Sequence, residues 1–409
     1  MCGICGVVAR SAAGLEPPEA LATAALQALH HRGPDAHGEY RDGRLWFGHT
    51  RLQILDLSDA GRQPMATTDG RFVICYNGEV YNFRELAAEL SLSGLRSNSD
   101  TEVVLRAFEE RGTAAWARLS GMFAFALYDR ARQKVWLVRD RLGIKPLYYR
   151  IDERGLWFGS EIKAILAMQG GTPSCDLAAV HEWLYYGATL GGRTMFRGLQ
   201  QLLPGHALEL DLESFSIDVR AYWSLAEHVG LADAEATEVG QVISETRTLI
   251  EAAVKRQLVS DVPVGVFLSG GVDSTAIAAF ASRHYAGRLA TYSAGFEGQE
   301  AIDERPKAKR LAAHFGTDHQ ELFIRGGEVA NLVEEMVRHH DQPFGDAANI
   351  PLYLMARQIS GKTKVVLQGD GGDELFGGYR RYATLAWRSW MHPAAMLLAP
   401  LHRLAAPSA

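Results

Sequence analysis

The first residue whose position suggests chemistry is Cys2, directly behind the initiator methionine in Met-Cys-Gly-Ile-Cys. If Met1 is removed, the α-amine of Cys2 lies next to its own thiol. An α-amine titrates near about 8, so at neutral pH part of it is free base and can take the thiol proton. The sequence therefore predicts an N-terminal cysteine nucleophile with its own amine as base, and retention of Met1 would displace that amine.

Cys2 and Cys5 also form a C-x-x-C pair, which in other proteins is a redox or zinc motif. A redox pair usually precedes a helix, whereas the apolar residues 6–9 indicate a strand here. A zinc site requires a second close pair of Cys or His residues, and Cys75 and Cys175 stand alone. Both alternatives are therefore disfavoured.

An acyl-transfer nucleophile also needs an oxyanion hole and groups that hold the substrate. Asn77 and Gly78 follow a buried-strand pattern and offer a side-chain amide and a backbone N–H. Arg51 can pair with a carboxylate through two hydrogen bonds, and Asp100 can accept an ammonium group. Asn-Gly alone is usually a turn, and a lone Arg or Asp usually lies on the surface. Together these residues describe a site for an α-amino acid.

A second set of residues has the character of a phosphate site. The segment Ser269–Ser274, Ser-Gly-Gly-Val-Asp-Ser, lies between an apolar strand pattern and an alanine-rich helix pattern. Glycine N–H groups and a helix N-terminus favour bound phosphate, and the G-x-x-x-x-G-K-S/T pattern of a Walker loop is absent from the sequence around it. The later segment Gln368–Tyr379 contains three carboxylates, Asp370, Asp373 and Glu374, which suit Mg²⁺ held against ATP phosphates.

The elements that position these residues differ between the two halves of the chain. In the first half, short apolar strands alternate with glycine turns and a few helices, which predicts stacked sheets covered by helices. In the second half, strands and helices alternate, which predicts a parallel sheet with helices on both faces. Strands are predicted at 6–9, 45–48, 72–76, 122–127, 134–139, 156–159, 264–268, 289–294 and 364–367. Helices are predicted at 18–29, 82–90, 101–111, 242–258, 275–285, 304–315, 329–339 and 350–359.

The composition narrows the class of protein. The 409 residues carry a formal net charge of −6, which argues against a nucleic-acid surface. The N-terminus lacks a signal-peptide pattern, and the sequence contains no apolar run long enough to span a bilayer. We expect a cytoplasmic protein with small-molecule substrates, without nucleic-acid or membrane partners; a homodimer stays open.

Five blocks of the first half resemble the glutaminase domain of class II glutamine amidotransferases in order and spacing. They are Cys2–Ile4, His31–Asp35, Tyr76–Glu79, Ser99–Glu102 and Arg139–Tyr149, the last interpreted as mainly structural. The resemblance implies an N-terminal nucleophile αββα sandwich with Cys2 as nucleophile and Asn77 and Gly78 as the oxyanion hole. It also implies that glutamine is bound by Arg51, Asn77, Gly78, Glu79 and Asp100.

The second half is similar to ATP pyrophosphatases of the PP-loop type and, with Gln368–Tyr379, to asparagine synthetases. Matching blocks are Pro204–His206, Tyr222–Trp223, Tyr292–Phe296 and Asp341–Phe344. The resemblance implies a doubly wound parallel-sheet PP-loop domain, so that the fold class is α/β and α+β. ATP binding is then carried by Leu268, Ser269, Gly270, Gly271, Asp273, Ser274, Ala294, Gln368 and Gly369. Asp273 and Asp373 are the implied Mg²⁺ ligands, and Asp370 is a catalytic residue that promotes adenylation.

These expectations divide the chain into a glutaminase domain at 2–220, a linker at 221–240 and an incomplete synthetase domain at 241–409. The predicted reaction is glutamine-dependent asparagine synthesis from ATP and aspartate. Gln368 stands where the family often has Ser, and Asp370 stands where some members have Glu. The branch with Asp370 includes enzymes that amidate sugar carboxylates for polysaccharides. A glutaminase or regulatory protein without a working synthetase site is the other alternative.

The family's synthetase domain normally extends far beyond Ala409. We therefore expect this chain alone to hydrolyse glutamine but to make little amide. We also expect it to associate through the dense apolar segment at 383–401.

Overall fold

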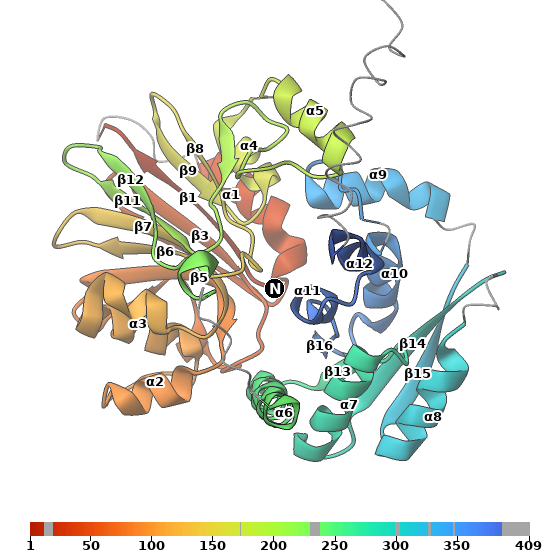
Figure 1. Ribbon diagram of the computed structural model, residues 1–409. Coiled ribbons are helices and arrows are strands. Elements are labelled where there is room, and N and C mark those ends of the chain that lie inside the picture. Colours follow the sequence, from red (N-terminus) through yellow and green to blue (C-terminus); the bar gives the residue numbers. More distant parts are fainter. Residues whose placement is uncertain are drawn as a thin grey trace, which may run out of the picture.

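The computed structural model describes residues 1–11, 19–171, 173–229, 238–298, 303–325, 329–346 and 348–386 (Figure 1). Residues 230–237 of the predicted linker lie outside this part of the chain. Residues 387–409, with most of the apolar segment expected to drive association, lie outside it as well.

Two six-stranded antiparallel sheets form the first half, which we call the sandwich. The order is β10-β8-β9-β1-β3-β2 in one sheet and β12-β11-β7-β6-β5-β4 in the other. The strands of the first sheet are β1 (Gly3–Ala9), β2 (Ala36–Asp42), β3 (Leu45–Arg51), β8 (Tyr148–Ile151), β9 (Gly155–Gly159) and β10 (Leu199–Gln201). Those of the second are β4 (Met65–Ala66), β5 (Phe72–Val80), β6 (Gly121–Asp129), β7 (Lys134–Arg139), β11 (His206–Asp211) and β12 (Ile217–Ala221).

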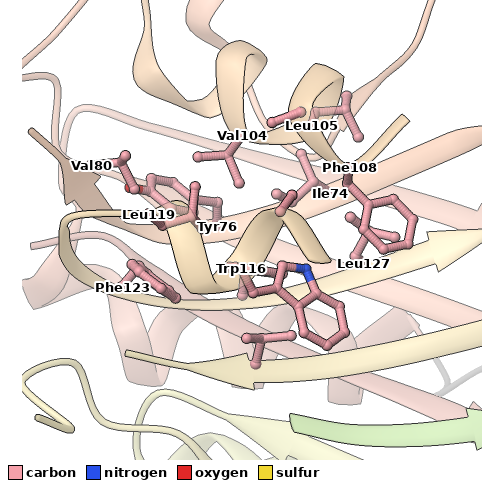
Figure 2. Packing of buried hydrophobic residues seen from close by; sticks show 14 of the residues in the cluster. Ile74, Tyr76, Val80, Val104, Leu105, Phe108, Trp116, Leu119, Phe123 and Leu127 are labelled. Carbon is pink, nitrogen blue, oxygen red and sulfur yellow. The ribbon is translucent and has the colours of Figure 1, made fainter. Parts of the chain in front are cut away.

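Helices cover the outer face of each sheet. One core cluster joins the inner faces, with Val8, Phe47, Cys75 and Leu137 among its members. The helices α1 (Glu19–Leu29) and α4 (Ile162–Gln169) pack on the first sheet, and α2 (Phe83–Glu89) and α3 (Asp100–Arg111) pack on the second. Figure 2 shows the latter cluster, in which Phe108 stacks on Trp116 with ring centroids 6.0 Å apart. The four layers are those of the expected αββα sandwich.

The second half, which we call the parallel-sheet unit, has the strand order β15-β14-β13-β16 with all pairs parallel. Its strands are β13 (Val264–Phe267), β14 (Ala290–Phe296), β15 (Asp318–Ile324) and β16 (Val365–Leu367). On one face pack α6 (Val239–Gln257), α7 (Val272–His284) and α8 (Arg305–Phe315). On the other pack α9 (Val329–His340) and α10 (Asn349–Ile359). Helices on both faces confirm the doubly wound prediction.

Shorter elements complete the described fold. They are the helices α5 (Leu177–Tyr186), α11 (Gly372–Phe376) and α12 (Arg380–Ala386) and the 3₁₀ turns η1 (His30–Arg32), η2 (Asp59–Gly61), η3 (Gly112–Arg118) and η4 (Leu225–Glu227). Over the described ranges, every helix is too short or too polar to cross a membrane.

Candidate active site

Cys2 lies at the edge of the sandwich that faces the parallel-sheet unit, where the N-terminus is marked in Figure 1. Gly3 of β1 pairs with Thr50 of β3, which brings Cys2 beside the end of β3. Leu52 N donates to Cys2 Sγ over 3.4 Å, and Arg32 Nε donates to the Cys2 carbonyl over 2.9 Å. The backbone of Leu52 therefore holds the thiol, and the Arg32 side chain holds the carbonyl of the same residue. Burial raises its pKa, so it needs a base to become a thiolate.

A small cavity beside Cys2 brings together most of the residues expected to bind an amino acid. Its walls include Cys2, Arg51, Gly78, Glu79 and Asp100. These residues come from both sheets and from the start of α3, so the sandwich must close before they meet.

Arg51 is held in place by the loop that follows it. Its Nη1 donates to Ser58 O over 2.9 Å, and its Nη2 donates to Asp56 O. A Cβ on Gly61 would come within 2.1 Å of Nη2, so this loop can close around the guanidinium only with glycine there. Because backbone carbonyls occupy one side of the guanidinium, a fixed positive charge is presented toward the cavity.

Asp100, the first residue of α3, supplies the negative charge on the opposite side. Its Oδ2 accepts from Tyr76 Oη over 2.7 Å and from Val80 N over 2.8 Å. Burial raises the pKa of Asp100 to about 6, although these hydrogen bonds act in the other direction. Burial and the charge of Asp100 also raise the pKa of Glu79 well above its usual value. The neighbouring carboxyl groups of Asp100 and Glu79 are therefore suited to bind a cationic group of a ligand.

Asn77 does not line the cavity, but its two neighbours in β5, Tyr76 and Gly78, do. Alternate residues of a strand point to opposite faces, so Asn77 points to the same side as Cys75, between the sheets. Cys75 Sγ contacts Gly48 O of β3 at 3.4 Å, which places this side toward β3. Within the described chain, Asn77 Nδ2 and Oδ1 are both buried without a hydrogen-bond partner. A buried amide without partners is costly unless a ligand satisfies it.

The chain's α-amine is surrounded by charged groups that the sequence analysis did not assign to the site. Burial lowers the pKa of the Met1 amine to about 5, and Arg32 and Lys145 act in the same direction. Burial also lowers the pKa of Lys145 to about 8, and its Nζ lies 3.0 Å from Met1 Sδ. With its pKa at about 5, the Met1 amine is uncharged at neutral pH. Lys145 belongs to the block interpreted as mainly structural, so only the resemblance drew attention to it.

The Ser269–Ser274 segment forms the turn after β13 and the first three residues of α7. Gly270 has φ +84°, a conformation that suits glycine. Ser269 Oγ lies 3.0 Å from Ser274 Oγ and accepts from Gly271 N over 3.2 Å. Leu268 N donates to Tyr292 O over 2.8 Å, which places Ala294, two residues further along β14, at the same end of the sheet. The loop therefore opens at the carboxyl edge of the parallel strands, where ligands of such sheets bind.

The acidic segment Gln368–Tyr379 follows β16 and contacts this loop. A Cβ on Gly369 would lie 3.0 Å from Asp273 Cβ, and one on Gly372 would lie 2.6 Å from Asp273 Oδ2. Gln368 Nε2 donates to Asp370 Oδ2, and burial raises the pKa of Asp370, with Glu374 and Asp346 acting in the same direction. Within the described residues, no group of three His, Cys, Asp or Glu side chains is arranged to hold a metal unaided.

Lys307 was not predicted for this site. Its aliphatic stem packs on Gly270, where a Cβ would lie 3.1 Å from Lys307 Cδ. The lysine comes from α8, far along the chain, and no local pattern could have indicated this contact.

Two family models match this chain, one in each half. The family model for a glutamine amidotransferase domain matches residues 1–223, and the model for asparagine synthase matches residues 245–407. The protein thus combines a glutamine amidotransferase unit with an asparagine synthase unit.

Several named relatives match most of this chain. A Methanocaldococcus jannaschii protein named "Putative asparagine synthetase (glutamine-hydrolyzing) 2" is 33% identical over 93% of this chain and 76% of its own length. The glutamine-hydrolyzing asparagine synthetase 1 of Bacillus subtilis is 34% identical over 93% of this chain. The amidase chyE of Penicillium rubens is 31% identical over 87% of it. This chain belongs to the glutamine-hydrolysing asparagine synthetase family. It spans only 59% of the Bacillus relative and 54% of the Penicillium one.

Proposed function

We propose that this protein transfers the amide nitrogen of glutamine to the β-carboxylate of aspartate, with ATP as the activating substrate, and so makes asparagine. The observation that carries the proposal is the cavity lined by Cys2, Arg51 and Asp100, beside the strand of Asn77, whose buried amide has no hydrogen-bond partner within the described residues. The cavity places a nucleophile next to charges of both signs, and the amide of Asn77, in the strand between Tyr76 and Gly78 of its wall, is the proposed donor to the oxyanion of an acyl intermediate.

In the proposed glutaminase half, Arg51 binds the α-carboxylate of glutamine and Asp100, with Glu79 beside it, binds the ammonium. The thiolate of Cys2 attacks the side-chain carbonyl, while Asn77 and the N–H of Gly78 donate to the oxyanion. Collapse of this intermediate forms a thioester and releases ammonia, and water then releases glutamate. The α-amine of Cys2, freed when Met1 is removed, takes the thiol proton and returns it to the departing nitrogen.

In the proposed synthetase half, the turn Ser269–Ser274 binds the phosphates of ATP through backbone N–H groups at the start of α7. Asp273 and Asp373 would hold Mg²⁺, which would supply charge compensation for those phosphates. Leu268, Ala294, Gln368 and Gly369 are proposed to line the rest of the nucleotide site, and Asp370 to assist adenylation of the acceptor carboxylate. The proposed glutaminase domain comprises residues 2–220 and the proposed synthetase domain residues 241–409, with 221–240 as the linker.

A second candidate keeps both half-reactions and changes the acceptor to another carboxylate, such as that of a sugar acid. The similarity to a protein named an amidase, at nearly the same identity as the named synthetases, supports this alternative. Asp370, one methylene shorter than the glutamate of some members, also leaves the acceptor open.

The test measures each half-reaction separately. Purified protein is assayed for glutamate release from glutamine, and for ATP–pyrophosphate exchange with aspartate and with a uronic acid in parallel. The proposal expects glutaminase activity that Cys2→Ala abolishes, and exchange with aspartate that Asp273→Asn abolishes and Cys2→Ala leaves intact. Exchange with the uronic acid alone favours the second candidate. Glutamate release without any exchange would leave a glutaminase and overturn the synthetase assignment.

A further inference from the structure

Glu161 joins the two halves of the molecule through a line of charged side chains. It follows β9, and its side chain is only 10% exposed. Its Oε1 accepts from His31 Nε2 over 3.0 Å and from Arg32 Nη1 over 2.8 Å. Its Oε2 accepts from Lys163 Nζ over 2.6 Å. Burial alone would raise the pKa of Glu161, but these three partners hold it well below the usual range, so the carboxylate stays charged.

On one side, this line ends at the nucleophile. The same Arg32 that binds Glu161 donates from Nε to the Cys2 carbonyl over 2.9 Å. A guanidinium is rigid and planar, so fixing one edge on Glu161 fixes the direction of the other edge. The position of the Cys2 backbone is therefore coupled to that of Glu161.

On the other side, the line crosses into the parallel-sheet unit. Lys163 Nζ lies 3.1 Å from Asp341 Oδ1, and Lys163 N donates to Asp341 Oδ2 over 3.0 Å. Lys163 Nζ also donates to His339 O over 3.1 Å. Asp341 follows α9 directly, has φ +65° and exposes only 8% of its side chain. Both carboxylate oxygens of Asp341 are thus engaged by a single residue of the sandwich.

We propose that Lys163 and Asp341 are positioning residues for the nucleophile and act through Glu161 and Arg32. The position of α9 against the sandwich then sets the rate of glutamine hydrolysis at Cys2. This inference rests on the proposed glutaminase function. Loss of Asp341 leaves the Lys163 ammonium with one carboxylate partner instead of two. Loss of Lys163 removes a cationic partner from both Glu161 and Asp341. Either change allows Glu161 to move, and Arg32 and the Cys2 carbonyl move with it.

The binding groups lie outside this line, which gives the proposal a kinetic signature. Arg51 is held by Ser58 O and Asp56 O, and Asp100 by Tyr76 and Val80. Loosening the line should therefore lower kcat for glutamine hydrolysis and leave KM nearly unchanged.

The experiment compares Lys163→Met, Asp341→Asn, the double variant and Lys163→Arg. We expect each single variant to lower kcat about 3- to 30-fold, the range that coupled networks carry, and the double variant to lose no more than the worse single one. Lys163→Arg keeps the charge and should recover most of the rate. The control is Arg256→Met, which removes the half-exposed pair of Arg256 with Glu85, another contact between the two halves. That variant should match the wild type.

A second readout does not need turnover. The rate of Cys2 alkylation by iodoacetamide is followed by peptide mass spectrometry; Cys5 and Cys75 are buried, and the exposed Cys175 is removed as Cys175→Ser. Lys163→Met and Asp341→Asn should change this rate, whereas Arg256→Met should not. If wild-type protein hydrolyses glutamine and both variants match it in kcat and alkylation, the inference is overturned. If wild-type protein does not hydrolyse glutamine, the proposed function fails, and the alkylation rates alone decide the inference.

Discussion

At the scale of single residues, the glutamine site depends on groups that are buried before any substrate arrives. Asn77 has no partner in the described chain, Arg51 is fixed by carbonyl groups, and Asp100 already accepts two hydrogen bonds. Binding groups and transition-state groups are thus different side chains, and substitutions should separate their effects on KM and kcat.

Asn77→Ala should lower kcat for glutamine hydrolysis by roughly 10²–10³, the usual loss for one oxyanion donor, with little change in KM. Arg51→Ala should show the opposite pattern, since a clamp on the α-carboxylate acts equally in the ground state and the transition state. Steady-state glutamate release measures both. An unchanged kcat for Asn77→Ala would remove Asn77 from the oxyanion hole.

Asp100 gives a pH dependence with a definite sign. Its pKa is raised to about 6, so the carboxyl becomes neutral as the pH falls through that value and loses its attraction for ammonium. KM for glutamine should therefore rise below pH 6, by about tenfold per pH unit at the limit of a single titrating group. Asp100→Asn should show a high KM that no longer changes there. A KM that stays flat from pH 5 to 7 in the wild type would contradict the assignment.

At the scale of elements, strands with continuous apolar runs were predictable, including the edge strand β16, whereas strands without such runs were missed. β7 was predicted at its observed bounds, Lys134–Arg139, because it is buried in the middle of its sheet. β2 and β15 were missed, since each lies at an edge and alternates buried or half-buried positions with exposed ones. The loops next to buried strands carry the predicted site residues, which is why short motifs could indicate them.

Contacts between distant elements could not be predicted in this way. The packing of Lys307 on Gly270 and the line from Arg32 to Asp341 depend on how helices and strands assemble. Nothing in their local sequence distinguishes these charged residues from surface ones.

The contact between the acidic segment Gln368–Tyr379 and the Ser269–Ser274 segment can be tested at the scale of elements. Gly369→Ala places a methyl group 3.0 Å from Asp273 Cβ and 3.1 Å from Ser274 N, so the two loops must separate. Overpacking of this kind costs about 1 kcal/mol or more, which corresponds to a loss of ATP affinity of about fivefold or more. Calorimetric binding of Mg·ATP measures it. Gly240→Ala, where a Cβ meets nothing within 4 Å, is the matched control.

At the scale of the whole molecule, the two halves have separate cores. The buried members of three clusters lie between Ile4 and Phe215, and those of the other three lie between Val254 and Ile359. Polar contacts join the halves, including Lys163 with Asp341 and Asp56 N with Asp261 Oδ2 at 2.8 Å. Val259 is a partly buried residue of the second half that packs on a cluster of the first. Polar contacts of this kind can couple the position of one half to that of the other while the two hydrophobic cores stay separate.

Separate cores should unfold in separate steps. Scanning calorimetry should resolve two transitions, and Mg·ATP should raise the midpoint of one, because a ligand at 100 times its Kd stabilises its own folded unit by about 2.7 kcal/mol. An electrophilic glutamine analogue bound to Cys2 should raise the other. Asp341→Asn should add no new transition. It should reduce any shift that a ligand of one half causes in the midpoint of the other half, because Asp341 joins the two halves through Lys163. A single transition that either ligand shifts as a whole would show that the interface, and not the two cores, sets the cooperativity of this molecule.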